Sequence, residues 1–568
     1  MSPSTEPTSA ASRVWLVVIL AALAALKVAY SLNWSFPAGA DGGYYTDIVQ
    51  HLLAGDGLVT DVSLYHRAFR SFPHADSIYP LWPLCYAAAA ALFPLEKVGV
   101  WLPSALYLTS LGTAFLWARR LVPGDLFRRV PGFGAGHVLV LLLGLHGAYF
   151  IHTSRPYTEG LAYALLFLCC WRAMPLLQRR TTTNGLELGA WLGVLLLVRS
   201  QLVIVPAALA GALLVGLALA REQRRELVVF CGAVGAGASL LLLPYALYLA
   251  ANSDGFSVWN YLLFGETPEA SPLSQARPYV RPDGVGHLRV LAHGVATAFA
   301  WGVNVSYRGS YHLFHYSLPI ALVLGGARLA RVLRDADGRA RTVAWLRDPK
   351  NAHWIMFALL AVLGFLSVQL LVKNEDRWYF HRRHNLVALP LFYFSLLALL
   401  RSRALPLALV GVVLLVGSVG IGARRVGFEI YKTDAAPRVP SRQSVVDWIN
   451  AERARLGRPL VVASSAPQVM VWRTPGVAYH EVNAEITTLD DVLVMFDQLG
   501  ADYLVSPLRD EVRHRQPRQR FDAELEMLPG VELGRLRVYR RRRAIGAEPN
   551  APAPFVGAPD APDDTDDL

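Results

Sequence analysis

The sequence predicts a mainly α-helical protein, in which a polytopic membrane domain of about 11 to 13 transmembrane helices precedes a small extracytoplasmic α/β domain. Hydrophobic residues make up 54% of the 568 residues and charged residues only 17%. Long apolar runs recur through the first three quarters of the chain, and a soluble composition follows from about Ser441. This combination is typical of an integral membrane protein with one appended domain.

The first apolar run, residues 14–32, predicts a retained membrane anchor. A helix needs roughly 20 residues to cross the hydrocarbon core of a bilayer. A cleavable signal peptide would have a shorter apolar region and a small-residue cleavage site. Here Lys27, Tyr30, Asn33 and Trp34 occupy that end instead.

Further apolar runs predict ten more spans. They are residues 97–118, 136–152, 159–177, 186–198, 202–220, 228–251, 316–333, 353–372, 385–400 and 404–422. The stretch 79–95 is short and interrupted by prolines, so it is either re-entrant, interfacial or a further span.

The loop arginines predict the orientation, because cytoplasmic loops retain an excess of Lys and Arg. The arginines that alternate with the spans are Arg119, Arg120, Arg128, Arg129, Arg179, Arg180, Arg221, Arg224, Arg225, those of 328–350, Arg401 and Arg403. We therefore expect a multi-pass protein of the cell (inner) membrane with a cytoplasmic N-terminus. Residues 33–96, 153–158, 252–315, 373–384 and everything after about 424 would face outward. The same arginines explain the net charge of +11, which argues against a nucleic-acid partner.

The region 425–545 predicts the outer α/β domain. Helical patterns at 444–457 and 487–500 alternate with strand-like runs at 459–465, 476–482, 501–507 and 531–540. Such alternation favours a largely parallel sheet. The termini, residues 1–13 and the acidic Pro/Ala-rich 546–568, are predicted to be disordered.

The first candidate site is the outer-loop segment AGADGGYYTDIVQHLLAGDG, residues 38–57. Tyr45, Ile48, Val49 and Leu52 share one face of a predicted amphipathic helix along the membrane surface. Asp41 near its start is a candidate catalytic carboxylate. The alternative is that Asp41 only caps the helix and that Asp47 is solvated.

A second acidic candidate, Glu159, lies at the outer end of the fourth span. A carboxylate at that depth is costly unless it is used or paired. The alternative to a catalytic role is an internal ion pair with Arg155, four residues earlier.

Outward arginines are the third element, and they depart from the orientation rule. They are Arg67, Arg70, Arg155, Arg199, Arg377, Arg382 and Arg383. Planar guanidinium groups bind phosphate oxygens in a bidentate manner. The alternative is headgroup anchoring, but the cluster with Trp378, Tyr379, His381 and His384 is denser than anchoring requires.

These elements, in this order, resemble the GT-C superfamily of membrane glycosyltransferases, close to its dolichyl-phosphate-mannose protein mannosyltransferase and aminoarabinose lipid A transferase branch. The matching features are Asp41 with Tyr44 and Tyr45, YPLWPLCY at 79–86, Glu159, the broken spans around Arg199, and RWYFHRRHNLVALP at 377–390. The resemblance covers most of residues 14–540. The chain departs from the pattern at Gly42, where many relatives carry Glu, and at Tyr79-Pro80, where many carry Lys-Pro.

The resemblance implies transfer of a sugar from a polyprenyl-phosphate donor to a protein, lipid or glycan acceptor at the outer face of the membrane. Asp41 would be the general base and Glu159 would orient the acceptor or share that role. The implied substrate-binding residues are Tyr44, Tyr45, Arg67, Arg70, Arg155, Arg199, Arg377, Tyr379, Arg382 and Arg383. No step requires a metal, although Asp41 and Glu159 would offer carboxylate oxygens to a divalent cation.

Two other classes stay open on the residues alone. A transporter or lipid flippase would use intramembrane charges along a substrate path. It would need paired broken helices, and only one break, near Arg199, is seen in the sequence. A non-catalytic scaffold whose outer domain binds a polysaccharide or a protein is the third reading.

Overall fold

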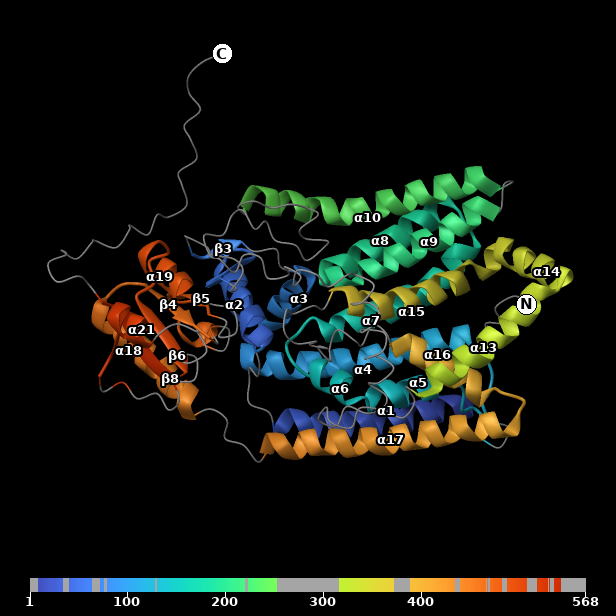
Figure 1. Ribbon diagram of the computed structural model, residues 1–568, viewed down its shortest axis with the longest axis horizontal. Helices are drawn as coiled ribbons and strands as arrows, with labels where there is room; N and C mark the ends of the chain where they lie inside the picture. Colours follow the sequence, from blue (N-terminus) through green and yellow to red (C-terminus); the bar gives the residue numbers. More distant parts are fainter. Residues whose placement is uncertain are drawn as a thin grey trace, which may run out of the picture.

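The computed structural model separates a long helical bundle from a small sheet domain, with the first-loop helices between them (Figure 1). It describes residues 9–33, 40–63, 72–75, 79–127, 130–219, 223–252, 316–371, 389–434, 440–465, 467, 470–482, 488–507, 518–529, 531 and 536–542.

Helices occupy every predicted span. They are α1 (Ala10–Leu32), α4 (Leu95–Leu121), α5 (Ala135–Gly144), α6 (Gly147–His152), α7 (Glu159–Gln178), α8 (Thr182–Val198), η1 (Ser200–Val203), α9 (Ile204–Leu219), α10 (Arg224–Asn252), α13 (Ser317–Arg334), α15 (Ala352–Leu371), α16 (Leu389–Leu400) and α17 (Leu405–Asp434). Among the described residues, five of them are long and apolar enough to cross a membrane: α1, α4, α7, α10 and α17. The mainly helical membrane architecture is confirmed.

The span predicted at 136–152 was wrong as a single helix, because the chain breaks between α5 and α6. A Cβ on Gly422 of α17 would lie only 2.5 Å from the carbonyl oxygen of Leu145, so α17 packs directly on the break. The imidazole Nδ1 of His146 then accepts from the backbone N–H of Tyr149 at 3.4 Å and begins α6. Helix α17 itself continues past the predicted end at 422.

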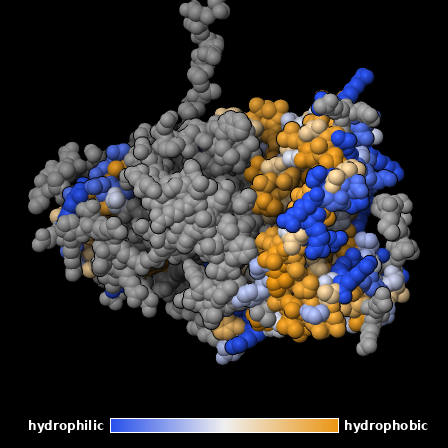
Figure 2. Space-filling model, turned by 45° about the vertical axis from the view of Figure 1, so that its right-hand side comes forward, coloured by the Kyte–Doolittle hydropathy of each residue, from blue (hydrophilic) through white to orange (hydrophobic). Residues whose placement is uncertain are grey.

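Loops that the sequence assigns to one side of the membrane gather at one end of the bundle. The Arg401 guanidinium donates to the Pro123 carbonyl at 2.8 Å, and that of Arg180 donates to the Gln223 side chain at 3.2 Å. The polar helix α14 (Ala336–Arg347) lies at the same end (Figure 1). Figure 2 shows apolar side chains over the helices and hydrophilic ones at the end away from the sheet domain.

The C-terminal domain is built on a six-stranded mixed sheet of order β2-β5-β4-β6-β8-β7. Its strands are β2 (Val62–Ser63), β4 (Leu460–Ser464), β5 (Val477–Glu481), β6 (Tyr503–Pro507), β7 (Leu525–Met527) and β8 (Leu536–Arg541); its helices are α18 (Pro440–Leu456), η9 (Val471–Arg473), α19 (Leu489–Asp497) and α21 (Arg518–Glu524). The α/β alternation is confirmed. The parallel part comprises β2, β5, β4 and β6, whereas β8 and β7 pair antiparallel.

One strand of this sheet comes from the first loop, some 400 residues earlier in the chain. Val62 pairs with Tyr479 and Ser63 with His480, in parallel register. The Tyr479 N–H donates to the Asp61 carbonyl at 2.7 Å. A two-stranded ladder of β1 (Val59–Thr60) with β3 (His74–Ala75) lies beside it. The loop therefore completes the sheet, which the sequence analysis did not anticipate.

A pH-dependent loss of stability is expected from His480 in β5. Its side chain is fully buried, with its ring 5.4 Å from that of Phe72. Burial lowers the pKa of His480 from 6.5 to about 4. Because the pKa of His480 is lower in the folded state than in the unfolded state, protonation favours the unfolded chain. The stability that neutral His480 contributes is therefore complete above pH 6.5 and is lost as the pH falls toward 4. We expect it to cost about 2 kcal/mol between pH 6.5 and about 5.

The measurement is the melting temperature of the full-length protein in detergent across this pH range. His480→Phe keeps an aromatic ring against Phe72 and should flatten the acid-side slope. A wild-type slope that persists unchanged in the variant would assign the acid sensitivity to other groups.

Candidate functional site

Asp41 lies in the first turn of α2 (Ala40–Ala54) and is half-buried. The helix forms over the predicted range, and a carboxylate near its N-terminus interacts favourably with the helix dipole. Tyr45, Ile48 and Val49 are buried as predicted. Tyr44 and Thr46 are buried too, so α2 is packed on several sides and not on one apolar face only; its position along the membrane surface stays a prediction.

The start of α2 packs closely against the turn that precedes α7. A Cβ on Gly42 would lie 2.9 Å from Cγ of Pro156 and 3.5 Å from Cε1 of Tyr157. Contacts under 3.0 Å do not occur at real Cβ atoms, so only glycine fits here without a shift. This contact brings Asp41 next to the turn that carries Arg155 and leads into Glu159.

The turn itself is held from two further sides. On α3 (Leu81–Ala90), the indole N–H of Trp82 donates to the Pro156 carbonyl at 3.2 Å. From α1, the buried ammonium of Lys27 donates to the Phe150 carbonyl at 2.9 Å and contacts the Ser154 hydroxyl. The ammonium also lies 3.8 Å from the centre of the Tyr107 ring, a cation–π contact. The turn is therefore a fixed part of the fold.

Glu159, the first residue of α7, is almost fully buried and forms an ion pair with Arg199. Their Oε1 and Nη1 atoms are 2.7 Å apart. Arg199 follows α8 in an extended conformation, where the predicted break in the helix occurs, and its guanidinium also donates to the Thr158 hydroxyl at 3.0 Å. The sequence offered Arg155 as the partner of Glu159, whereas the structure links Glu159 to a residue 40 positions away.

Tyr45 connects these parts electrostatically. Burial raises the pKa of its phenol well above the ordinary value, and Tyr79 and the charges of Asp41 and Glu159 raise it further while that of Arg199 lowers it. The structure thus brings Asp41, Glu159, Arg199 and Tyr45 into one region. Tyr44 lies beside Tyr45, with ring centres 5.8 Å apart.

Arg155 lies in the same turn. Its Nη1 donates to the Tyr157 hydroxyl at 3.4 Å, and the guanidinium lies 5.8 Å from the centre of that ring. Burial lowers the pKa of Arg155, but the charge and hydrogen bonds of Tyr157 and Tyr30 raise it to a net value above normal. The group is therefore a permanent cation in the turn that precedes Glu159.

The alternative reading of Asp47 as a solvated residue was wrong: the residue is 3% exposed. Its Oδ2 accepts from the Thr60 hydroxyl at 2.8 Å and from the Asp61 N–H at 2.9 Å. Burial raises the pKa of Asp47 to about 7, with a further increase from Asp61. His51 lies between the carboxylates of Asp47, Asp56 and Asp61. Although burial lowers the pKa of His51, these carboxylates raise it to about 9.

Six of the predicted substrate-binding residues lie outside the described residues: Arg67, Arg70, Arg377, Tyr379, Arg382 and Arg383. Their proposed roles stay predictions.

The sequence analysis missed several residues that shape the site. Trp82 and Lys27 fix the turn, and His51 and Asp61 join Asp47. Only the group of Asp47, His51 and Asp61 could have been suspected from the sequence, because Asp47 and His51 are four residues apart on one predicted helix and so share a face. Nothing local in the sequence identifies the partner of Lys27.

The described helices and the appended sheet domain define a polytopic membrane protein. The chain is similar to the crystal structure of the Archaeoglobus fulgidus oligosaccharyltransferase in complex with Zn and sulfate, with a TM-score of 0.55, 12% identity, and coverage of 89% of this chain and 71% of that one. It is also similar to ArnT from Cupriavidus metallidurans bound to undecaprenyl phosphate, with a TM-score of 0.51, 12% identity, and coverage of 94% and 99%. The apo form of that ArnT gives a TM-score of 0.50 at 13% identity, with coverage of 93% and 98%.

Both proteins are GT-C glycosyltransferases, so the resemblance seen in the sequence is confirmed at the level of the fold. No family model and no curated protein sequence matches the chain.

Substitution of Gly42 tests the contact between α2 and the turn. Gly42→Ala should lower the melting temperature, because the new Cβ overlaps Pro156 and overpacking costs about 1–3 kcal/mol. The matched control is Gly112→Ala in α4, where a Cβ meets nothing within 4 Å and should be neutral or slightly stabilising. Equal melting temperatures for the two variants would contradict the close packing.

A double-mutant cycle tests the buried ion pair. Glu159→Gln alone leaves a buried, uncompensated guanidinium and should cost about 3–5 kcal/mol. Adding Arg199→Gln should recover part of that loss, as measured by thermal unfolding in detergent. Glu526→Gln, which breaks the exposed pair with Arg540, should change stability by less than about 1 kcal/mol. Simple additivity of the Glu159 and Arg199 variants would show that the two side chains are not coupled.

Proposed function

We propose that the protein is an integral-membrane glycosyltransferase that moves a sugar from a polyprenyl-phosphate donor to an acceptor hydroxyl or amide at the outer face of the membrane. The observation that carries the proposal is the convergence of Asp41, Arg155 and the Glu159–Arg199 pair around one fixed turn in a GT-C fold. One carboxylate is only half-buried there, while the other is buried and paired.

In this mechanism the half-buried Asp41 is the general base. Its carboxylate takes the proton of the acceptor as the acceptor attacks the anomeric carbon of the sugar. The bond between that carbon and the phosphate oxygen breaks, and the polyprenyl phosphate leaves with the electron pair. Arg155 would stabilise the negative charge that develops on the phosphate.

Glu159 is assigned a different role from Asp41. Its buried carboxylate is already engaged by the Arg199 guanidinium at 2.7 Å, whereas Asp41 is half-buried. We therefore assign Glu159 to positioning Arg199 beside Tyr45, with orientation of the acceptor as a consequence. Tyr45 and Tyr44 would line the sugar or acceptor side of the same region.

The donor class is supported by the chemistry of the region and by a structural neighbour. Arginines at the outer end of the bundle suit an anionic lipid phosphate. The ArnT structure from Cupriavidus metallidurans holds undecaprenyl phosphate. The sugar could be a hexose or a pentose, and the acceptor a protein, a lipid or a glycan.

Asp41→Asn is the direct test of this proposal. The amide cannot accept the proton, so transfer should fall by about 10²–10⁴-fold while the melting temperature stays close to that of the wild type. Asp337→Asn in α14 is the matched control, because it removes an exposed carboxylate at the other end of the bundle and should leave transfer unchanged. The readout is mass analysis of cell-envelope glycans in cells that carry the wild type, either variant or no copy of the gene.

Near-normal glycan products with Asp41→Asn would remove Asp41 from the chemistry. Purified protein in liposomes tests the competing transport function. A lipid-linked substrate that crosses the bilayer without a new glycosidic bond would overturn the proposal in favour of a flippase.

A further inference from the structure

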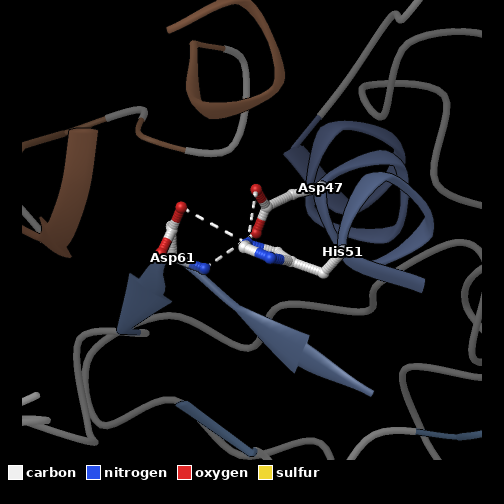
Figure 3. A group of neighbouring side chains, drawn as sticks. All are labelled: Asp47, His51 and Asp61. Carbon is white, nitrogen blue, oxygen red and sulfur yellow. Dashed lines mark hydrogen bonds and ion pairs between the residues drawn. The ribbon is translucent and has the colours of Figure 1, made fainter. Parts of the chain in front are cut away.

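A second cluster of functional side chains lies on α2, away from Asp41. It consists of Asp47 and His51 on α2 and of Asp61 between β1 and β2, and Figure 3 shows the three side chains facing one another. Asp41 and Asp47 are six residues apart, which is about 9 Å along a helix. The cluster is therefore distinct from the region around Asp41 and Glu159.

The donor atoms of these three residues are close enough to share one ion. They all lie within 4.8 Å of one another. His51 Nε2 is 3.3 Å from Asp61 Oδ2 and 3.9 Å from Asp47 Oδ1. Ligands of a tetrahedral Zn²⁺ at about 2.0–2.2 Å are separated by about 3.3–3.5 Å. The His51–Asp61 distance already matches this separation, and the His51–Asp47 distance would have to close by a few tenths of an ångström.

The surrounding hydrogen bonds leave the right atoms turned toward this centre. The other imidazole nitrogen, Nδ1, lies 2.9 Å from Asp56 Oδ2, so its N–H can donate there while Nε2 faces Asp47 and Asp61. Such carboxylate–histidine pairs are typical of metal sites. Asp47 Oδ2 accepts hydrogen bonds from the Thr60 hydroxyl and from the Asp61 N–H, whereas Oδ1 faces His51 Nε2 at 3.9 Å.

Charge and burial independently favour a cation. The exposed fraction of the side chain is 5% for Asp47, 17% for Asp61 and 15% for His51. Three carboxyl groups, from Asp47, Asp61 and the half-exposed Asp56, surround one imidazole. A buried excess of negative charge is costly unless it coordinates a metal or holds protons.

We propose that Asp47, His51 and Asp61 bind one divalent cation, with Zn²⁺ as the best match to one nitrogen and two oxygen donors at these separations. Mg²⁺ fits less well, because its octahedral geometry needs donors about 3 Å apart and mostly oxygen ligands. In the bound state Nε2 of His51 and one oxygen each of Asp47 and Asp61 would face the ion, while Asp56 keeps its hydrogen bond to Nδ1. A water molecule would complete the tetrahedron.

The ion would act as a structural clasp. It would join α2 to the segment whose Asp61 carbonyl accepts from Tyr479 and whose next residues form strand β2. The side chain of Gln50 on α2 already donates to the Trp472 carbonyl at 3.1 Å, so the same helix touches the C-terminal domain directly. The clasp would thereby fix α2, and with it Asp41, against the sheet.

The test uses the full-length protein in detergent, stripped with a chelator and then titrated with Zn²⁺ while bound metal is counted by elemental analysis. We expect one equivalent per chain and a rise in melting temperature. His51→Gln and Asp61→Asn should each weaken binding by more than 100-fold, and Asp56→Asn by about 10–100-fold. Asp41→Asn and the surface variant Asp497→Asn should both retain the full equivalent.

A stripped protein that takes up no Zn²⁺, or one that binds it equally well with His51→Gln, would overturn the proposal. Co²⁺ provides a second measurement that needs no variant: intense visible absorption indicates a tetrahedral site, and weak octahedral absorption would contradict it. The outcome is separable from the proposed function, because Asp41→Asn tests sugar transfer without touching the ion, and Zn²⁺ binding is read without any turnover.

Discussion

The packing of Gly42 against Pro156 is the contact on which the arrangement of the site depends. It sets the distance between the first turn of α2 and the turn before α7, and so between Asp41 and Arg155. Any side chain at position 42 would push these segments apart. The turn is held in place by Trp82 and Lys27, which means that α2 docks onto a rigid surface.

The other end of α2 is fixed by the C-terminal domain. Gln50 reaches the backbone of Trp472, and the loop that follows α2 pairs with β5 through Val62 and Ser63. The helix is therefore held between the membrane bundle and the sheet. A displacement of the sheet would be transmitted to Asp41 through a single helix of 15 residues. This gives the C-terminal domain a physical connection to the site, although none of its described residues is assigned to the chemistry.

Hydropathy and helical periodicity sufficed to predict the spans, the helix through Ala54 and the break at Arg199, because each depends on neighbouring residues only. The failures involve partners far away in the chain. The Glu159–Arg199 pair joins two helix ends, and spacing rules see only the nearby Arg155. The sequence suggests a solvated Asp47 because the segment that buries it, Thr60–Asp61, lies outside the helix. That segment is in turn held by β5, far away in the chain. Strand β2 has only two residues, too few for a pattern.

That short strand has a consequence for how the chain can be divided. The predicted domain boundary lies near residue 425, yet Val62–Ser63 pairs with the outer side of β5. Unpaired N–H and C=O groups along an exposed strand invite pairing with another molecule. A fragment that starts after the last membrane helix would leave Tyr479 and His480 without their strand partners and become prone to self-association. The C-terminal domain is thus folded together with Val62–Ser63 of the first loop. Cutting the chain at the predicted boundary would separate two neighbouring strands of one sheet.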